Sequence, residues 1–243
     1  MKDLPDMQPP STRGITIRWA RAYDVMLAVG TLGRERAMRD RLLDLAELRP
    51  GEHVLDVGSG TGTLTLAAKR RVGTSGRVRG IDAAVEMVGR ARCKAARAGV
   101  DVEFRAAVAE SLPCEDASFD AVLTCLMLHH LPDDVRVVAL REMRRVLRPT
   151  GRLLVIEFAP PRDVLRRLFT RATLGDRMAD FDLHGEAARM VAAGFEIVRQ
   201  GPSGVPLLDF ALARPTRRDA PGTSPRSEAA HSGTVAEIEG RLR

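Results

Sequence analysis

Aromatic residues are scarce in this chain, where one Trp, one Tyr and seven Phe make up 4% of 243 residues. So few rings argue against a stacking platform for single-stranded nucleic acid, which needs exposed aromatic side chains. Long apolar runs are missing as well, because the best run, Ala121–Leu128, is far shorter than the roughly 20 residues of a membrane-spanning helix. The N-terminal residues lack the apolar stretch of a signal peptide, so we expect a cytoplasmic protein.

The chain has only three cysteines, Cys93, Cys114 and Cys125. Their number is odd and no two of them have the spacing of a CxxC motif, so neither a disulfide framework nor a zinc site is indicated. We expect reduced, partly buried thiols and no bound metal.

Lysine is rare among the basic residues, since Lys2, Lys69 and Lys94 are the only lysines in a set of 38. The formal net charge of +6 is compatible with binding to nucleic acid or to an anionic membrane. The arginines, however, are spread along the chain and many have acidic neighbours. Solvated helix faces are therefore the favoured interpretation, and a phosphate or anionic-membrane surface stays open.

The chain is nevertheless rich enough in hydrophobic residues, at 44%, to build the core of one domain. Short apolar runs alternate with stretches of helical periodicity. Strands are expected at His53–Val57, Arg77–Ile81, Val102–Arg105, Asp120–Thr124 and Arg152–Phe158, and helices at Thr63–Arg71, Val85–Ala98 and Asp134–Leu147. This alternation predicts an α/β fold with a doubly wound, Rossmann-like sheet and helices on both faces.

The two ends of the chain differ from the middle in composition. Residues 1–14 hold three prolines and are expected to be a flexible lead-in, whereas residues 15–48 have the periodicity of two helices. After Pro161 we expect a helical segment to about Thr173, a helix at Gly185–Ala193, and an antiparallel hairpin of Phe195–Arg199 with Leu207–Ala213. Residues 214–243 are rich in Pro, Ser, Thr and Arg, which predicts a disordered tail and a main domain at 15–213.

The segment VLDVGSGTGTL at 54–64 is the most informative motif of the chain. An apolar strand leads into three alternating glycines and then into a helix, an arrangement that lets the backbone lie against a ligand at a helix N-terminus. Asp82 follows the next strand, where a carboxylate can accept both hydroxyls of a ribose. The spacing is not that of a dinucleotide site, and Asp56 just before the loop suits a ligand with a cationic end, such as S-adenosylmethionine.

Further segments of the sequence fit the same interpretation. They are YDVM at 23–26, GIDAAVEMV at 80–88, AVAESLPCEDASFDAVLT at 107–124, LREMRRVLRPTGRLLVIEF at 140–158 and AAGFEIV at 192–198. With them, the stretch from about Trp19 to Ala213 resembles the class I S-adenosylmethionine-dependent methyltransferases, especially the ubiquinone/menaquinone-biosynthesis C-methyltransferase type. The resemblance implies a seven-stranded sheet of order 3-2-1-4-5-7-6 with strand 7 antiparallel, and S-adenosylmethionine as cofactor with S-adenosylhomocysteine as product.

The resemblance also implies which residues hold the cofactor. Gly58, Ser59, Gly60 and Thr61 would line its methionine end after Asp56, and Asp82 would hold its ribose. The remaining implied contacts are Ala83 and Met87 beside the adenine, Val108, Ala109 and Glu110 in the loop that borders it, Cys125 near the cofactor, and Tyr23 closing over it from helices 15–48, which cap the site.

Two positions depart from the pattern of the family. Val108 stands where an Asp or Asn usually accepts a hydrogen bond from the adenine amino group, a loss of about 0.5–1.5 kcal/mol. His129-His130 replaces an Arg-Asn pair of the quinone enzymes, so a quinone acceptor does not follow from the resemblance.

Methyl transfer from a sulfonium is an in-line displacement that depends mainly on positioning, and a base is needed only when the acceptor must lose a proton. Candidates for such a base lie at the ends of strands: His129, His130 and Glu157. Packing or helix capping explains the same residues, so no catalytic residue is assigned.

We expect a small, apolar or amphipathic methyl acceptor. The alternatives are a phospholipid N-methyltransferase acting on an ethanolamine head group, with peripheral contact to an anionic membrane, and a non-catalytic relative that only binds the cofactor. A nucleic-acid substrate is disfavoured, because TCLMLHH at 124–130 lacks the motif that holds a flipped base. A monomer or a homodimer is expected.

Overall fold

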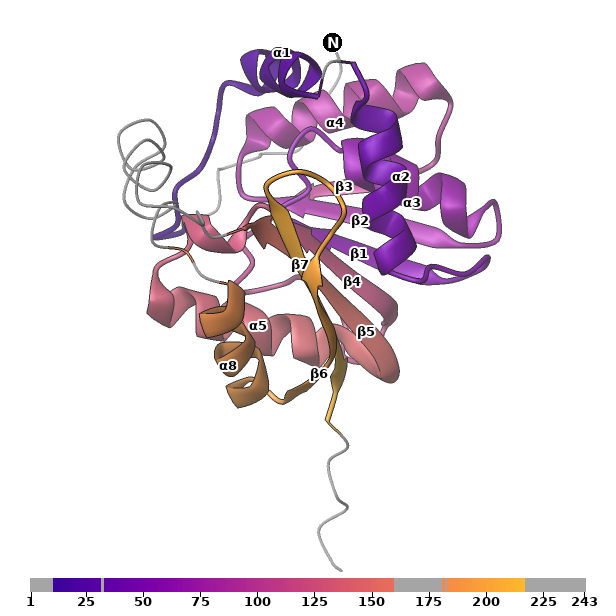
Figure 1. The fold of residues 1–243 in the computed structure, drawn as a ribbon. Coiled ribbons are helices and arrows are strands. Elements are labelled where there is room, and N and C mark those ends of the chain that lie inside the picture. The colour runs from indigo at the N-terminus through magenta and orange to yellow at the C-terminus, as the bar shows by residue number, and fades with distance from the viewer. Residues whose placement is uncertain (1–10, 32, 160–180, 182, 217–243) are drawn as a thin grey trace, which may run out of the picture.

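The structure, a computed structural model, describes residues 11–216 apart from 32, 160–180 and 182. Its centre is a seven-stranded sheet of order β3-β2-β1-β4-β5-β7-β6, shown in Figure 1. The strands are β1 (His53–Val57), β2 (Arg77–Asp82), β3 (Glu103–Ala106), β4 (Phe119–Cys125), β5 (Leu147–Phe158), β6 (Phe195–Pro202) and β7 (Leu208–Pro215). The expected strand order is confirmed.

The pairing of the strands is mixed in the expected way. Strands β1 to β5 pair in parallel, and β7 runs antiparallel to both β5 and β6. The order reverses between β1 and β4, because β1 pairs with β2 on one side and with β4 on the other. In a sheet of this kind the ligand crevice lies beyond the carboxyl ends of the strands at that reversal.

Helices cover both faces of the sheet (Figure 1). On one side lie α2 (Glu35–Leu45), α3 (Thr63–Val72) and α4 (Val85–Ala98), and on the other α5 (Asp133–Val146) and α8 (Leu183–Ala192). A further helix, α1 (Ala20–Gly30), contacts α4. Alternate residues of the strands feed two separate cores: Val54 and Leu123 pack toward α2 and α3, whereas Leu55 and Val122 pack toward α5.

Several element ends differ from those expected from the sequence. Strand β5 begins at Leu147 rather than Arg152, because Leu147 pairs with Phe119 across a register shift that brings the turn residues Pro149 to Gly151 into the strand. Strand β7 continues to Pro215, which pairs with Phe195. The boundary expected between the main domain and the tail, after residue 213, therefore falls inside this strand. The expected helix between Pro161 and Thr173 lies outside the described residues.

The ends of the described chain are held by hydrogen bonds. Thr12, which the sequence placed in a flexible lead-in, donates to Glu110 over 2.6 Å, and Arg13 pairs with Asp134. At the other end, the backbone N–H of Thr216 donates to Gly194 over 2.9 Å. The tail 217–243 lies outside the described residues. None of the helices that the structure describes has the length and apolarity of a membrane span.

Candidate cofactor site

The glycine loop between β1 and α3 has a backbone that other residues would not adopt easily. Gly58, Gly60 and Gly62 all have positive φ, at 77°, 53° and 80°. A Cβ on Gly58 would lie 2.3 Å from Cγ of Met127, and one on Gly62 would lie 2.7 Å from the ring of Phe104. A Cβ on Gly60 would meet nothing within 4 Å. The outer glycines therefore serve close packing, while Gly60 lies beside open space.

Asp82 at the end of β2 holds this loop. One carboxylate oxygen accepts the backbone N–H of Gly60 over 2.8 Å, and the other accepts that of Ala84 over 2.8 Å. Burial raises the pKa of Asp82 above its ordinary value, although the two backbone hydrogen bonds act in the opposite direction. Each oxygen keeps further lone pairs, so the carboxylate can fix the loop and also accept hydroxyl donors.

Asp56 lies beneath the loop and is 1% exposed. Its carboxylate accepts the hydroxyl of Thr65 over 2.6 Å. Burial raises its pKa to about 6, and the negative charge of Asp82 adds to this, while Thr65 and Arg39 act against it. A carboxylate of this kind is a ready partner for a cation that arrives in the site.

The residues expected around an adenine are apolar and buried or half-buried. Met87 and Ala84 are buried and pack with Ala20 and Tyr23 of α1. Val108 and Ala109 are each 9% exposed and sit in the loop after β3. Ala83 lies between Asp82 and Ala84 and is half-buried.

Helix α1 is tied to the glycine loop by a cluster of charges that sequence reasoning missed. Asp24 accepts hydrogen bonds from Lys94 over 2.5 Å, Thr61 over 2.6 Å and Arg90 over 2.9 Å. Lys94 also donates to Thr61 over 2.8 Å and to Thr63 over 3.2 Å. Burial alone would raise the pKa of Asp24, but these hydrogen bonds hold it below its usual value. We call Asp24, Thr61, Arg90 and Lys94 the α1 latch.

Arg39 on α2 is a second residue that the sequence did not single out. Its side chain is buried, with Nη1 3.6 Å from the Cys125 sulfur and Nη2 3.6 Å from a carboxylate oxygen of Glu35. Cys125 ends β4, and burial raises the pKa of its thiol to about 11. Burial likewise raises the pKa of Tyr23 to about 12, and the charges of Arg39, Cys125 and Asp82 act on the same hydroxyl. Tyr23, Arg39 and Cys125 thus face one region above Asp56.

Buried polar atoms without a hydrogen-bond partner gather at this edge of the sheet. Within the described part of the chain there are six, one of them on Glu186, whose other oxygen accepts a hydrogen bond from Arg136. The other five are Glu35 Oε1, Arg39 Nε, Ser59 Oγ, Glu110 Oε2 and Thr124 Oγ1. Buried polar groups are normally paired, so this grouping indicates a site for a polar ligand.

Glu157 and His129, two candidates for a catalytic base, bind each other. Glu157 is fully buried in β5, and one of its oxygens accepts the backbone N–H of Met127 over 3.0 Å and of Leu128 over 2.7 Å. Its other oxygen lies 2.7 Å from Nδ1 of His129, which is 3% exposed. Glu157 therefore caps the short helix η1 (Leu128–His130). His130 is half-buried, and its carbonyl accepts the N–H of Ile15.

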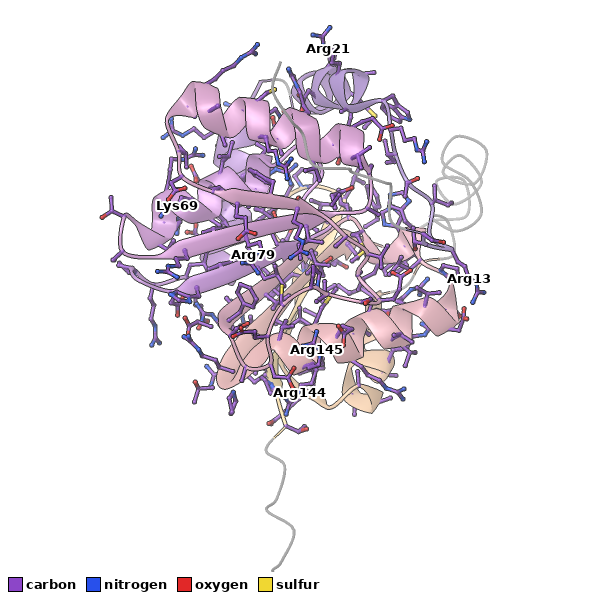
Figure 2. The ribbon with its side chains drawn as sticks, turned by 180° about the vertical axis from the view of Figure 1, so that it is seen from behind. Arg13, Arg21, Lys69, Arg79, Arg144 and Arg145 are labelled. Atoms are coloured by element: carbon purple, nitrogen blue, oxygen red, sulfur yellow. The ribbon has the colours of Figure 1, made fainter. Side chains whose placement is uncertain are left out.

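A cavity of about 890 Å³ lies at the opposite ends of the strands. It is lined by residues at the starts of β1, β2 and β3, among them His53, Arg77, Arg79 and Glu103, and so is separate from the glycine loop. Figure 2 shows Arg79 and Lys69 in this region and Arg21 on α1. Arg145, in the last turn of α5, donates to the carbonyl of Cys114, which also lines the cavity. The labelled basic side chains are thus distributed over several regions. Within residues 11–216 as described, no group of His, Cys, Asp or Glu could hold a metal.

Comparisons with known proteins agree with this geometry. Residues 54–151, from β1 into β5, match the family described as "Methyltransferase domain". The chain is also 42% identical, over 144 residues, to the ubiquinone/menaquinone biosynthesis C-methyltransferase UbiE of Hahella chejuensis. That match covers 58% of this chain and 57% of the relative, so the chain spans little more than half the length of such relatives.

Solved structures share the fold at lower identity. A SAM-dependent methyltransferase from Aquifex aeolicus superposes with a TM-score of 0.63 at 23% identity, over 72% of this chain and 88% of the other. The cyclase SpnF superposes with a TM-score of 0.60 at 23% identity, over 74% of this chain and 81% of the other. Since one of these proteins is named as a cyclase, the fold alone does not define the reaction.

Proposed function

We propose that this chain is a class I S-adenosylmethionine-dependent methyltransferase that transfers a methyl group to a small apolar or amphipathic acceptor. The observation that carries the proposal is the glycine loop, whose Gly60 amide is bound by Asp82 at the reversal of the strand order. The similarity to a C-methyltransferase of quinone biosynthesis supports the same reaction class.

The residues of the site fit S-adenosylmethionine. Asp82 would accept the ribose hydroxyls, Met87 and Ala109 would serve as apolar walls for the adenine, and Ser59 has a buried hydroxyl without a hydrogen-bond partner. Val108 offers no side-chain acceptor for the adenine amino group, but the neighbouring Glu110 has a buried oxygen without a partner. The bound donor supplies a methyl group already activated on a sulfonium.

Neither Glu157 nor His129 is proposed as a base. Both oxygens of Glu157 are engaged by Met127, Leu128 and His129, and both side chains are buried. The chain's contribution is then to orient the two reactants and to exclude water from them, which is enough for an acceptor with a nucleophilic atom of its own.

Ligand-dependent melting tests the donor. S-adenosylhomocysteine should raise the melting temperature of the protein and NAD should not, because only a ligand that binds the native state stabilises it. Asp82→Asn should weaken the binding of S-adenosylhomocysteine by about 1.5–3 kcal/mol, because the ribose loses a charged acceptor and either Gly60 or Ala84 loses the acceptor of its N–H. Asp101→Ala, which removes an exposed acid outside the loop, is the matched control. Stabilisation by NAD alone would contradict the proposal, and a screen with labelled donor would identify the acceptor.

A second candidate is methylation of a lipid head group at an anionic membrane. It is favoured by the exposed apolar side chains of Trp19, directly before α1, and of Met26 and Val29 on α1, next to Arg18 and Arg21. Figure 2 shows Arg21 pointing away from the body of the protein. Co-sedimentation with phosphatidylglycerol vesicles that weakens with salt would support it, and equal binding to phosphatidylcholine vesicles would contradict it.

A further inference from the structure

In the described part of the chain, helices α3 and α4 cover one face of strands β2 and β3, and no helix packs on the other face. Phe104 of β3 packs with Val88 and Ala91 of α4 on the covered face. The connection from β3 to β4, residues 107–118, forms turns and loops but no helix. Figure 2 shows Arg79 over the strands without a helix across it. A doubly wound sheet is normally covered on both faces, so this open face departs from the usual pattern.

Charged side chains line the open face. Arg77 and Arg79 alternate along β2. In the pairing of β2 with β3, Glu103 lies opposite Arg79, and Arg105 lies opposite Ile81. Paired residues of neighbouring strands point to the same face of a sheet, and Ile81 is four residues beyond Arg77. Arg77 and Arg105 therefore share this face, about 13 Å apart along the strands.

Arg79 already has its partners, whereas Arg77 and Arg105 do not. Nε and Nη2 of Arg79 each lie 2.7 Å from one carboxylate oxygen of Glu103, and its Nη1 lies 3.5 Å from the Cys114 sulfur. Among the described residues, none has a hydrogen bond or an ion pair with the side chain of Arg77 or Arg105. The two guanidinium groups therefore keep their donors for an incoming ligand.

The open face is the floor of the cavity at the starts of the strands, which has a volume of about 890 Å³. Small-molecule sites have volumes of roughly 300–1,000 Å³. The lining has hydroxyl groups on Thr74 and Ser75 but little apolar surface, because Val78 and Phe119 are buried. The cavity therefore fits a small polar ligand better than an apolar one.

Positive charge predominates on the floor of the cavity. The charged lining residues are Lys69, Arg77, Arg79 and Arg105 on one side of the balance and Asp101, Glu103 and Glu115 on the other. Glu103 is paired with Arg79, and Asp101 and Glu115 come from exposed connections rather than from strands. A guanidinium matches the oxygens of a carboxylate or a phosphate with two parallel N–H bonds. Two unpaired guanidinium groups on one floor thus fit two acid groups of one ligand.

We propose that this cavity is a second binding site, for a small oxyanion with two or more acid groups, which Arg77 and Arg105 bind from either side of Arg79. The site lies at the opposite end of the sheet from the glycine loop, so it does not depend on the proposed function. Its ligand is a phosphate chain or a polycarboxylate, because both present pairs of oxygens to a guanidinium.

Three anions test the site on the full chain. We would measure the affinities of inorganic triphosphate, citrate and orthophosphate by calorimetry at constant ionic strength, since salt screens exposed charges. Triphosphate or citrate should bind at least about tenfold more tightly than orthophosphate, because a second acid group binds within the same complex. Arg77→Met and Arg105→Met should each weaken the preferred anion by about 5- to 20-fold. Arg36→Met removes an exposed arginine from α2 and should leave the affinity unchanged.

The outcomes separate a built site from general attraction to a basic protein. Equal weakening by Arg36→Met would overturn the proposal, because any lost positive charge would then have the same effect. Triphosphate and citrate that bind no more tightly than orthophosphate would overturn it too, as would unchanged affinities in Arg77→Met and Arg105→Met. A tenfold preference for triphosphate assigns the site to phosphate chains, and one for citrate assigns it to polycarboxylates. If a Met variant does not fold, Arg77→Lys decides, since it keeps the charge, loses the fork and should still weaken the preferred anion.

Discussion

Replacing Glu157 distinguishes a structural carboxylate from a catalytic one. In the structure the fully buried Glu157 side chain accepts two backbone N–H groups, of Met127 and Leu128, and contacts the ring of the buried His129. Glu157→Gln keeps an oxygen for the two N–H groups, and its amide can donate to Nδ1 of His129 in the other tautomer. Glu157→Leu keeps a similar volume but removes every acceptor.

The expected magnitudes follow from these contacts. Each buried N–H that loses its acceptor costs about 1–3 kcal/mol, and His129 also loses its partner, so Glu157→Leu should lower the free energy of unfolding by about 3–5 kcal/mol. For a domain of this size that is a fall of about 10 °C in melting temperature. Glu157→Gln should cost about 1 kcal/mol or less, because its hydrogen-bond pattern can be preserved.

Two measurements on both variants decide between a structural and a catalytic role of Glu157. The first is urea denaturation, and the second is the turnover of the acceptor found by the labelled-donor screen. We expect Glu157→Gln to retain both the stability and the turnover of the wild type within a few-fold. A Gln variant of normal stability whose turnover falls by roughly a hundredfold or more would refute the structural role, because a general base contributes about that much.

Two further predictions concern the glycine loop and the acid beneath it. The pKa of Asp56 is raised to about 6, so the stability that the protonated group contributes is present below pH 3.8 and is lost as the pH rises through 6. The melting temperature of Asp56→Asn, measured relative to that of the wild type, should therefore rise by about 3–5 °C when the pH is raised from 5 to 7.5. A difference between the two proteins that does not change with pH would contradict this. Gly58→Ala should unfold the loop, because its Cβ would lie 2.3 Å from Met127. Gly60→Ala should cost only about 1 kcal/mol of stability and yet weaken the binding of S-adenosylhomocysteine. Similar losses of stability in the two variants would show that Gly60 also packs closely.

Most of the fold could be predicted from local signals. The helix Val85–Ala98 has the predicted bounds, and the hairpin of β6 and β7 follows the Gly/Pro turn that indicated it. The sheet order came from the resemblance rather than from periodicity. The missed start of β5 has a physical reason: Pro149 and Gly151 indicate a turn locally, but the pairing of Leu147 with Phe119 extends the strand around them.

The glycine loop, Asp56 and Asp82 could be found because their spacing along the chain is itself the signal. Arg39 could not, since it is one arginine among many on an ordinary helix, and only the packing of α2 against β4 buries it. The pairing of Glu157 with His129 joins residues 28 positions apart. Glu157 stood out in an apolar strand, but whether it faced a crevice or capped a helix depended on where η1 lies.

The α1 latch has a consequence for the electrostatic potential around a positively charged donor. Lys94 and Arg90 place two cations beside the glycine loop, and Lys94 touches Thr61 of the loop itself. Asp24 is the acid that pairs with both cations, and it comes from another helix. A protein truncated before α2 would keep the loop, Asp56 and Asp82 but would confront the incoming sulfonium with two uncompensated positive charges. Helix α1 thus supplies the negative charge that balances these two cations.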